Sequence, residues 1–460
     1  MREMITRIQS IELEGFKNIQ KGSIDLLSYR QKIYYSGKSD VIGIYGQNGS
    51  GKTAIIEAFK LFKTIASGEK LPTDIKNYIH ELEDKATLKF VFYLELGDKK
   101  FLVYYKFSLR RKDEEAELFN EKLSYSELNE ENKKRKINII EYDIDSKDSS
   151  ILPKSRYNEL IKNNKENEFN LEVYKRISIK EKTSFIFNES LKEIFKNNST
   201  NLDYFNIITA IKYFARVNLF VITNEHSATI SLNFIPLSFR MENSNGVTSG
   251  DISINLLGPS NLDKTKYDIA TQIIEQLNIV LNTIIPNLQL DIENLGNALS
   301  KNGGEIVTIE LFSIKKGIKV PLKYESEGIK KIISILSTLI SMFNNPSICL
   351  IVDELDAGIY EYLLGELLKV IEQKGKGQFI FTSHNLRALE MLQKESLVFS
   401  TANPSNRFMR MPNIKNNNNL RNVYLRDVDL GGLDECIYEE TNSFEIAHAF
   451  RKAGDILEKN

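Results

Sequence analysis

The chain has 460 residues, which is enough for two or three domains and a large hydrophobic core. Lysine and arginine number 61 against 62 aspartates and glutamates, so the net charge is −1 and no overall field draws the protein onto DNA or acidic lipid. Two cysteines, Cys349 and Cys436, are too few for a disulfide framework or a thiolate metal site, which indicates a reducing cytoplasm. The N-terminus is charged and the most apolar stretches carry charges, so neither a cleavable signal nor a membrane span is expected.

A P-loop pattern follows a short apolar run near the N-terminus. The segment IYGQNGSGKT (44–53) fits G-x-x-x-x-G-K-[ST] through Gly46, Gly51, Lys52 and Thr53. Its glycines let backbone N–H groups face phosphate oxygens, and the helix that follows adds the positive end of its dipole. Lys52 is expected to reach the β- and γ-phosphates and Thr53 to ligate Mg²⁺. The pattern therefore predicts binding of ATP with Mg²⁺.

The middle of the chain, residues 112–264, is expected to be a mostly helical insert domain. Residues 110–138 are charge-dense without a sustained apolar period, which favours solvated helix and loop. Their basic run, 133–136, is flanked by glutamates, so a solvated face is favoured over a nucleic-acid site. The apolar content rises from Phe205 to Ile222, which indicates a small core of the insert's own. Residues 267–286 then predict an amphipathic helix that re-enters the preceding domain, and two strand-like runs follow.

An apolar stripe at helical spacing begins directly after Ser326-Glu327-Gly328. Ser326 is suited to be the N-cap, which leaves free N–H groups and a positive dipole end at the start of this helix. An ordinary capped core helix would have the same pattern. Its place one helix and a turn before an Asp-Glu pair favours a functional role.

Two short apolar runs end in polar residues further on. SICLIVDELD (347–356) suits a central strand of a parallel sheet that is buried on both faces. At its end, Asp353 is expected to hold the Mg²⁺ water shell and Glu354 to act as the general base on the attacking water. GQFIFTSHN (377–385) predicts the next parallel strand, so His384 should reach the same rim of the sheet and contact the γ-phosphate.

The P-loop, the Ser-x-Gly helix start, the Asp-Glu strand and the strand before the histidine, in that order, resemble the ABC-type ATPase heads of recombination and chromosome-structure proteins. The opening IQSIELEGFKNIQ is similar to their first strand and Phe-Lys turn, and Asn48 matches their Gly-x-Asn-Gly loop. The resemblance covers roughly residues 1–110 and 265–460. It implies an α/β fold: a P-loop ABC-type head with a mixed, mainly parallel sheet and flanking helices, interrupted by an α+β insert.

In such heads two subunits enclose two ATP molecules, and the signature of one subunit caps the γ-phosphate held by the other. The resemblance assigns this signature to Ser326 and Gly328, although Glu327 replaces a glycine of the usual LSGGQ. Catalytic roles are then expected for Glu354, His384 and Lys52, and metal binding for Thr53 and Asp353. The complete set of nucleotide-binding residues is expected to be Gly46, Asn48, Gly49, Ser50, Gly51, Lys52, Thr53, Ser326 and Gly328.

A narrower resemblance rests on YESEGIKKI, VDELDAGIYEYLLGELL, GQFIFTSHN and the segment from Asn419 to Gly454. These are similar to OLD-like AAA ATPases of bacterial anti-phage systems, nearest to the AbiL/RloA-type abortive-infection ATPases, with the AriA component of PARIS as a cousin. The resemblance implies an ATPase that senses infection and controls a separately encoded toxic nuclease. A Toprim nuclease domain is not expected after His384, and neither long heptad arms nor a Cys-x-x-Cys zinc hook appear.

The sequence thus predicts a cytoplasmic Mg²⁺-dependent ATPase with head lobes at 1–111 and 265–460 and an insert at 112–264. It is expected to form a homodimer or higher homo-oligomer around ATP and to control a partner, most plausibly a Toprim-type nuclease encoded nearby. Two alternatives stay open: a RecF-like DNA-repair ATPase that acts on DNA, and a non-hydrolysing ATP-gated scaffold. No membrane partner is expected, and charge does not point to nucleic acid.

Overall fold

A six-stranded, mainly parallel sheet carries the P-loop at the carboxyl end of one of its inner strands. Its strand order is β19-β18-β3-β17-β16-β9, and only the pairing of β19 with β18 is antiparallel. The four inner strands, β18, β3, β17 and β16, are mostly apolar and buried at every residue, as expected when both faces of the sheet are covered. Their carboxyl ends share one rim, because Val352 is in register with both Ile222 and Phe381. The strands are β3 (Asp40–Tyr45), β9 (Leu219–Ile222), β16 (Cys349–Val352), β17 (Gln378–Thr382), β18 (Leu397–Ser400) and β19 (Phe408–Met409).

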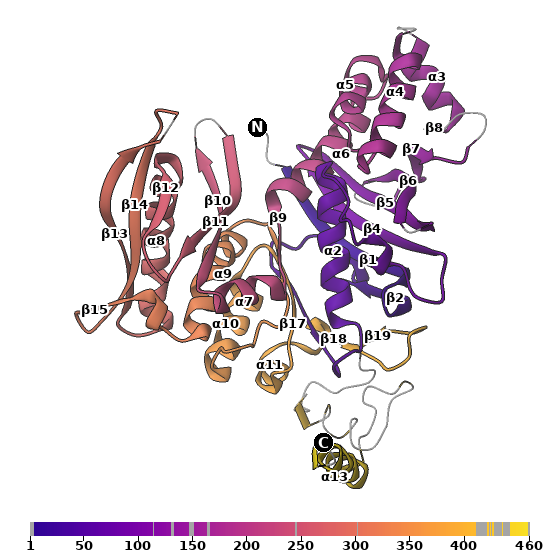
Figure 1. Ribbon diagram of the computed structural model, residues 1–460. Helices are drawn as coiled ribbons and strands as arrows, with labels where there is room; N and C mark the ends of the chain where they lie inside the picture. The colour runs from indigo at the N-terminus through magenta and orange to yellow at the C-terminus, as the bar shows by residue number, and fades with distance from the viewer. Residues whose placement is uncertain are drawn as a thin grey trace.

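The computed structural model describes most of the chain (Figure 1). The described residues are 4–113, 115–129, 133–146, 151–162, 166–243, 246–300, 302–410, 421, 422, 424, 426, 435 and 442–458. The predicted asparagine-rich loop, 416–419, and Cys436 lie outside them.

A second sheet of seven antiparallel strands has the order β2-β1-β4-β5-β6-β7-β8. The predicted opening strand is confirmed as β1, which ends at Phe16, and Lys17 follows in a left-handed turn with φ 52°. The strands are β1 (Met4–Phe16), β2 (Ile19–Asp25), β4 (Lys85–Leu96), β5 (Lys99–Lys112), β6 (Glu115–Leu128), β7 (Ile137–Asp143) and β8 (Ile151–Leu152).

The expectation of solvated helix and loop for the charge-dense residues 110–138 is wrong over most of its length. Residues 115–128 form β6, which pairs with β5 and β7. Many of the charges are cross-strand ion pairs on the sheet surface: Arg110 Nη2 lies 2.5 Å from Glu117, and Lys122 Nζ lies 2.6 Å from Glu141. The charged side chains hid the alternation of a half-buried strand.

Helix α2 (Lys52–Ser67) fills the space between the two sheets (Figure 1). Phe62 packs against β4, with its ring centroid 4.6 Å from that of Phe90 and 5.2 Å from that of Phe92. The opposite face of the parallel sheet is covered by α9 (Glu327–Asn344) and α10 (Glu361–Lys374), and α8 (Lys264–Ile284) packs against α9. Apolar residues of all three helices belong to one core with that face. The predicted α/β class, a mainly parallel sheet with flanking helices, is confirmed.

The middle of the chain, expected to be a mostly helical α+β insert, contains both helices and strands. Residues 112–264 contain strands β6 to β12 as well as helices, and β5 runs across the expected boundary at residue 111. The apolar stretch from Phe205 to Ile222 forms no separate core: α6 belongs to the same core as α2, and β9 joins the P-loop sheet. The reason is that these apolar residues pack against segments that are distant in the sequence, and a short stretch of sequence does not show such contacts. The division into 1–111, 112–264 and 265–460 therefore stays a proposal. The helices of this segment are α3 (Lys154–Lys162), α4 (Glu166–Glu181), α5 (Glu189–Asn198), α6 (Leu202–Tyr213) and α7 (Asn224–Ser231).

A third group of strands lies beside α8, at the left of Figure 1. The predicted amphipathic helix is confirmed as α8, and the two strand-like runs after it fall in β14 and β15. The strands are β10 (Phe234–Asn243), β11 (Gly246–Asn255), β12 (Ser260–Asp263), β13 (Leu288–Leu299), β14 (Glu305–Lys315) and β15 (Ile318–Pro321). The remaining helices include α1 (Leu27–Arg30), α11 (Leu386–Met391) and α13 (Ser443–Glu458).

Candidate functional site

The P-loop lies between β3 and α2, and its conformation depends on glycine. Gly46 has φ 152°, and a Cβ there would lie 2.0 Å from Ser400 Oγ, so both backbone and space require the absence of a side chain. Ser50 Oγ donates to Gln47 O at 2.6 Å and lies 2.5 Å from Ser400 Oγ. Gly46 and Ser50 are buried beneath the loop, whereas Asn48 and Gly49 are exposed on it. The end of β18 thus supports the loop from below.

The start of α2 is left open to an anion. Its N-cap is Gly51, which has no side chain. The first N–H groups of this helix therefore have no hydrogen bond to a capping side chain within the described residues. Thr53 is the second residue of the helix and is exposed. Free N–H groups and the positive dipole end at the same point suit phosphate.

Lys52 turns back onto the loop. Its Nζ donates to Gly46 O at 2.7 Å and to Gln47 O at 2.9 Å, and the residue is 7% exposed. Burial lowers the pKa of Lys52, against the opposing effect of the nearby Asp353 and Glu354 carboxylates. Among the described residues its acceptors are these two neutral carbonyls, so a phosphate in the cleft would offer it a stronger, charge-assisted partner.

Asp353 and Glu354 follow the last residue of β16, as predicted. Asp353 is 2% exposed, and its N–H donates to Ile222 O at 2.8 Å. Thr382 Oγ1 donates to Asp353 Oδ1 at 2.5 Å and accepts the N–H of Glu354 at 2.7 Å. Glu354 has φ 46°, a left-handed conformation that costs energy for a residue with a side chain.

The second oxygen of Asp353 provides the fit test for a metal. Asp353 Oδ2 is buried and has no hydrogen-bond partner in the described part of the chain. Buried carboxylate oxygens normally have partners, and Mg²⁺ prefers carboxylate and hydroxyl oxygens together with water. Asp353 and the Thr53 hydroxyl line the same cleft, so these residues fit the predicted metal.

His384 completes the rim. It is exposed, and its backbone N–H donates to Asp356 Oδ2 at 3.2 Å. A cleft of about 460 Å³ is lined by His384 together with Lys52, Asp353 and Glu354. The structure therefore brings the predicted residues of the P-loop, the Asp-Glu turn and the histidine strand to one place.

The predicted signature lies elsewhere and does not line this cleft. Ser326 is exposed and is the N-cap of α9, where its Oγ accepts the N–H of Ile329 at 3.3 Å. Glu327 Oε1 accepts a hydrogen bond from Ser231 Oγ at 3.0 Å, so the residue in the place of the usual glycine has a partner in its own chain. Gly328 is buried, and a Cβ there would lie 1.7 Å from Gly358 O. Close packing within the chain is sufficient reason for glycine at 328.

Several residues of the cleft were not predicted from the sequence. Lys17 and Asn18, in the turn after β1, line it beside the P-loop; Asn18 Nδ2 donates to Gly49 O at 2.6 Å and Lys17 Nζ lies 2.5 Å from Glu57. Thr382 was not predicted either. Asn224 follows β9 and does not line the cleft itself; its Oδ1 is buried and finds no hydrogen-bond partner among the residues that the structure describes. The signal for Asn224 was an apolar run ending in a polar residue, as for Asp353.

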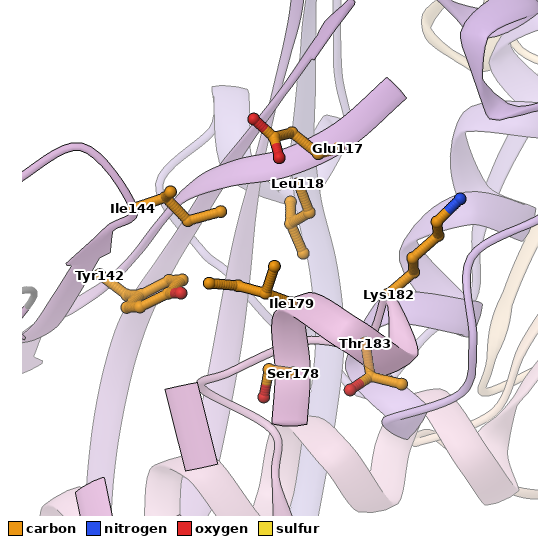
Figure 2. Close-up of a pocket in the computed structure, with 8 residues that line it drawn as sticks. All are labelled: Glu117, Leu118, Tyr142, Ile144, Ser178, Ile179, Lys182 and Thr183. Atoms are coloured by element: carbon orange, nitrogen blue, oxygen red, sulfur yellow. The ribbon is translucent and has the colours of Figure 1, made fainter. Parts of the chain in front are cut away.

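A separate small cavity lies between β6, β7 and the end of α4. The side chains of Leu118, Ile144 and Ile179 and the ring of Tyr142 point toward one another there, whereas Lys182 points away (Figure 2). Its volume of about 20 Å³ is room for one water molecule at most. It is unsuited to a nucleotide.

Comparisons with known proteins agree with a P-loop ATPase. The family model described as "AAA domain, putative AbiEii toxin, Type IV TA system" matches residues 41–390. No curated protein matches the chain. No helix within the described residues is long and apolar enough to cross a membrane.

Solved structures with similarity to this chain include ATPase heads at low sequence identity. The Smc head bound to the C-winged helix domain of ScpA has 13% identity, covers 88% of this chain and 97% of its own, and gives a TM-score of 0.45. The SMC head domain from Thermotoga maritima has 15% identity, covers 88% and 100%, and gives 0.38. The recombination mediator RecF has 13% identity, covers 82% and 93%, and gives 0.34.

The family match, residues 41–390, includes the P-loop, the start of α9, the Asp-Glu turn and His384, so it contains the predicted signature and all of the cleft lining except Lys17 and Asn18. The chain belongs to the family of AAA domains described as putative AbiEii toxins of type IV toxin–antitoxin systems.

Proposed function

We propose that the protein is an Mg²⁺-dependent ATPase. The observation that carries this proposal is the convergence of Lys52, Asp353, Glu354 and His384 on one cleft, beside the open start of α2. The cleft joins phosphate-binding N–H groups to a carboxylate suited to a metal and a second carboxylate suited to be a base.

The chain's own residues have separable roles in this proposal. Lys52 exchanges its contacts with Gly46 and Gln47 for phosphate oxygens. Thr53 and Asp353 would hold Mg²⁺, which would neutralise phosphate charge. Glu354 accepts the proton of the attacking water, and His384 contacts the γ-phosphate from the neighbouring strand end.

The first experiment measures binding and turnover separately. Lys52→Ala should abolish ATP affinity, because a charge-assisted contact is lost. Glu354→Gln should bind ATP normally but turn it over about 10²- to 10⁴-fold more slowly, the usual contribution of a positioned base. Turnover by Glu354→Gln at the wild-type rate would refute the assignment of the base.

Assembly around ATP is the second part of the proposal. Ser326 is exposed at the start of α9 but does not line the cleft of its own chain, so we place it on the nucleotide of a second copy. Gly328 is unsuitable for a test because its substitution would disturb the contact with Gly358. Ser326→Arg should block hydrolysis while ATP affinity is retained, and mixing it with Lys52→Ala chains should restore about one working site per heterodimer. Inactive mixtures under proven subunit exchange would contradict this assembly.

The biological role is the third part. Closure driven by nucleotide does work only if a partner binds the open and closed states differently. The family description names a type IV toxin–antitoxin system. The sequence also resembles ATPases of anti-phage systems. We therefore propose an abortive-infection role in which the ATPase restrains a separately encoded effector of the Toprim nuclease class.

Co-expression with the neighbouring gene, followed by size-exclusion chromatography with and without ATP, tests this role. A complex whose stability changes with nucleotide is expected. If no complex forms in either state and DNA ends strongly stimulate hydrolysis, the RecF-like alternative replaces this proposal.

A further inference from the structure

The start of α9 is attached to the Asp353–Gly358 turn by a lysine that the ATPase proposal does not use. Lys331 is 5% exposed, and its Nζ donates a hydrogen bond to the backbone carbonyl of Glu354. One turn earlier on α9, the backbone of Gly328 packs directly on that of Gly358. Two contacts on one face of α9 therefore hold both ends of this turn.

The turn needs such support because Glu354 is in a strained conformation. A left-handed residue with a side chain persists only when its surroundings fix it. Thr382 holds the N–H of Glu354 from the sheet side, and Lys331 holds its C=O from the helix side. The direction of the Glu354 side chain thus depends on both neighbours.

Thr382 and Lys331 differ in how freely the elements that carry them can move. Thr382 ends β17, which is paired on both sides in the centre of the sheet. Lys331 belongs to α9, whose exposed N-terminus at Ser326 is the proposed contact with the nucleotide of a second copy. A small shift of α9 would therefore reach Glu354 through Lys331 while the sheet stays fixed.

We propose that Lys331 is a positioning residue that couples the start of α9 to Glu354. When the nucleotide held by one subunit contacts Ser326 of the second subunit, Lys331 of the second subunit orients Glu354 in that same second subunit. This inference rests on the proposed function, because it requires both ATP hydrolysis and the contact between copies. It adds a route for communication between the two sites that the ATPase proposal alone does not contain.

Lys331→Met tests the coupling, because methionine keeps an unbranched apolar stem and removes the ammonium. Lys330 supplies a matched control: it is the neighbouring residue of α9, is equally 5% exposed, and donates to another backbone carbonyl, Lys323 O at 2.7 Å. Lys331→Met should lower kcat on the order of 10-fold to 100-fold, the loss expected for one hydrogen bond from a charged group, with ATP affinity unchanged. Lys330→Met should leave kcat within about twofold, and Lys331→Arg should recover part of the loss.

A double-mutant cycle with Ser326→Ala separates coupling from a general structural effect. If Lys331 transmits the state of α9, then Ser326→Ala combined with Lys331→Met should be no slower than the slower single variant. Melting temperatures of all variants should agree within a few degrees. Multiplicative losses in the double variant, or an equal loss of kcat in Lys330→Met, would overturn the inference. A wild-type protein that binds ATP but never hydrolyses it would instead remove the proposed function, before any variant is compared.

Discussion

Thr382 joins the two acidic residues of the candidate site, and its replacement by valine removes both links without changing the shape of the side chain. The residue is 1% exposed at the end of β17. Its hydroxyl donates to Asp353 Oδ1 and accepts from the N–H of Glu354. Valine is also β-branched, so the strand itself should tolerate the change.

The size of the effect follows from the two bonds. A hydrogen bond to a carboxylate is worth roughly 1.5–3 kcal/mol and a neutral one roughly 0.5–1.5 kcal/mol. Both orient groups that act on ATP in the proposed mechanism, so about 2–4 kcal/mol of site organisation is at stake. At about 1.4 kcal/mol per factor of ten, Thr382→Val should lower kcat by roughly 30-fold to 1000-fold.

The assay is steady-state phosphate release over a range of ATP concentrations, together with thermal unfolding of each variant. Thr338 offers the matched control: it is fully buried, and its Oγ1 donates to Ile335 O at 2.7 Å within α9. Thr338→Val should cost some stability but leave kcat nearly unchanged, and Thr382→Ser should retain most activity. A kcat for Thr382→Val within about twofold of wild type would refute the idea that this hydroxyl organises the site.

Three further predictions concern backbone strain and buried charge. Glu354→Gly should abolish turnover yet raise the free energy of unfolding by up to about 1 kcal/mol, because glycine accepts φ 46° without strain. Denaturant unfolding measures this free energy, and a less stable variant would contradict the prediction. Gly328→Ala should destabilise the protein by about 1–3 kcal/mol, because the new methyl overlaps Gly358 O, whereas Gly258→Ala, with nothing within 4 Å, should be nearly neutral in the same unfolding assay. Burial raises the pKa of Glu121 above its ordinary 4.5, so the native state keeps its proton to higher pH than the unfolded state does, and the free energy of unfolding should fall as pH rises above that value. Glu121→Gln should flatten this dependence of unfolding free energy on pH, and an unchanged slope would count against the prediction.

The parts of the site that the sequence predicted are those set by local pattern. Glycine spacing defines the P-loop, the unalternating run before Asp353 marks a strand buried on both faces, and Ser326 precedes an apolar stripe as an N-cap does. Each of these signals lies within about ten residues. Parallel pairing then carries Asp353 and His384 to one rim without further information.

The parts that could not be predicted depend on contacts between distant segments. Ser400 supports Gly46 from β18, and Thr382 reaches across to Asp353, yet neither residue stands out in its own window. The same limit explains β6, where ion pairs such as Lys122 with Glu141 make a sheet surface resemble a solvated helix. Glu327 is similar: it departs from the expected glycine, and only the position of Ser231 on α7 shows what the carboxylate contacts.

The arrangement of supports around Glu354 indicates where regulation can act. Moving Thr382 would require β17 to slip between β3 and β16, which would break backbone pairing on both sides. Helix α9 is held differently along its length: its apolar face packs against side chains, and its first turns contact Ser231, Gly358 and Glu354. Backbone hydrogen bonds from Lys376 and Gly377 attach its last turn to the segment before β17, so its first turns are the part that can shift. Side-chain packing tolerates small shifts that a hydrogen-bonded strand does not. Binding of a second copy or of a protein partner would therefore move the turn at Glu354 through α9 with the least loss of backbone pairing. A partner that binds near Ser326 would control hydrolysis in the proposed mechanism without contacting the P-loop.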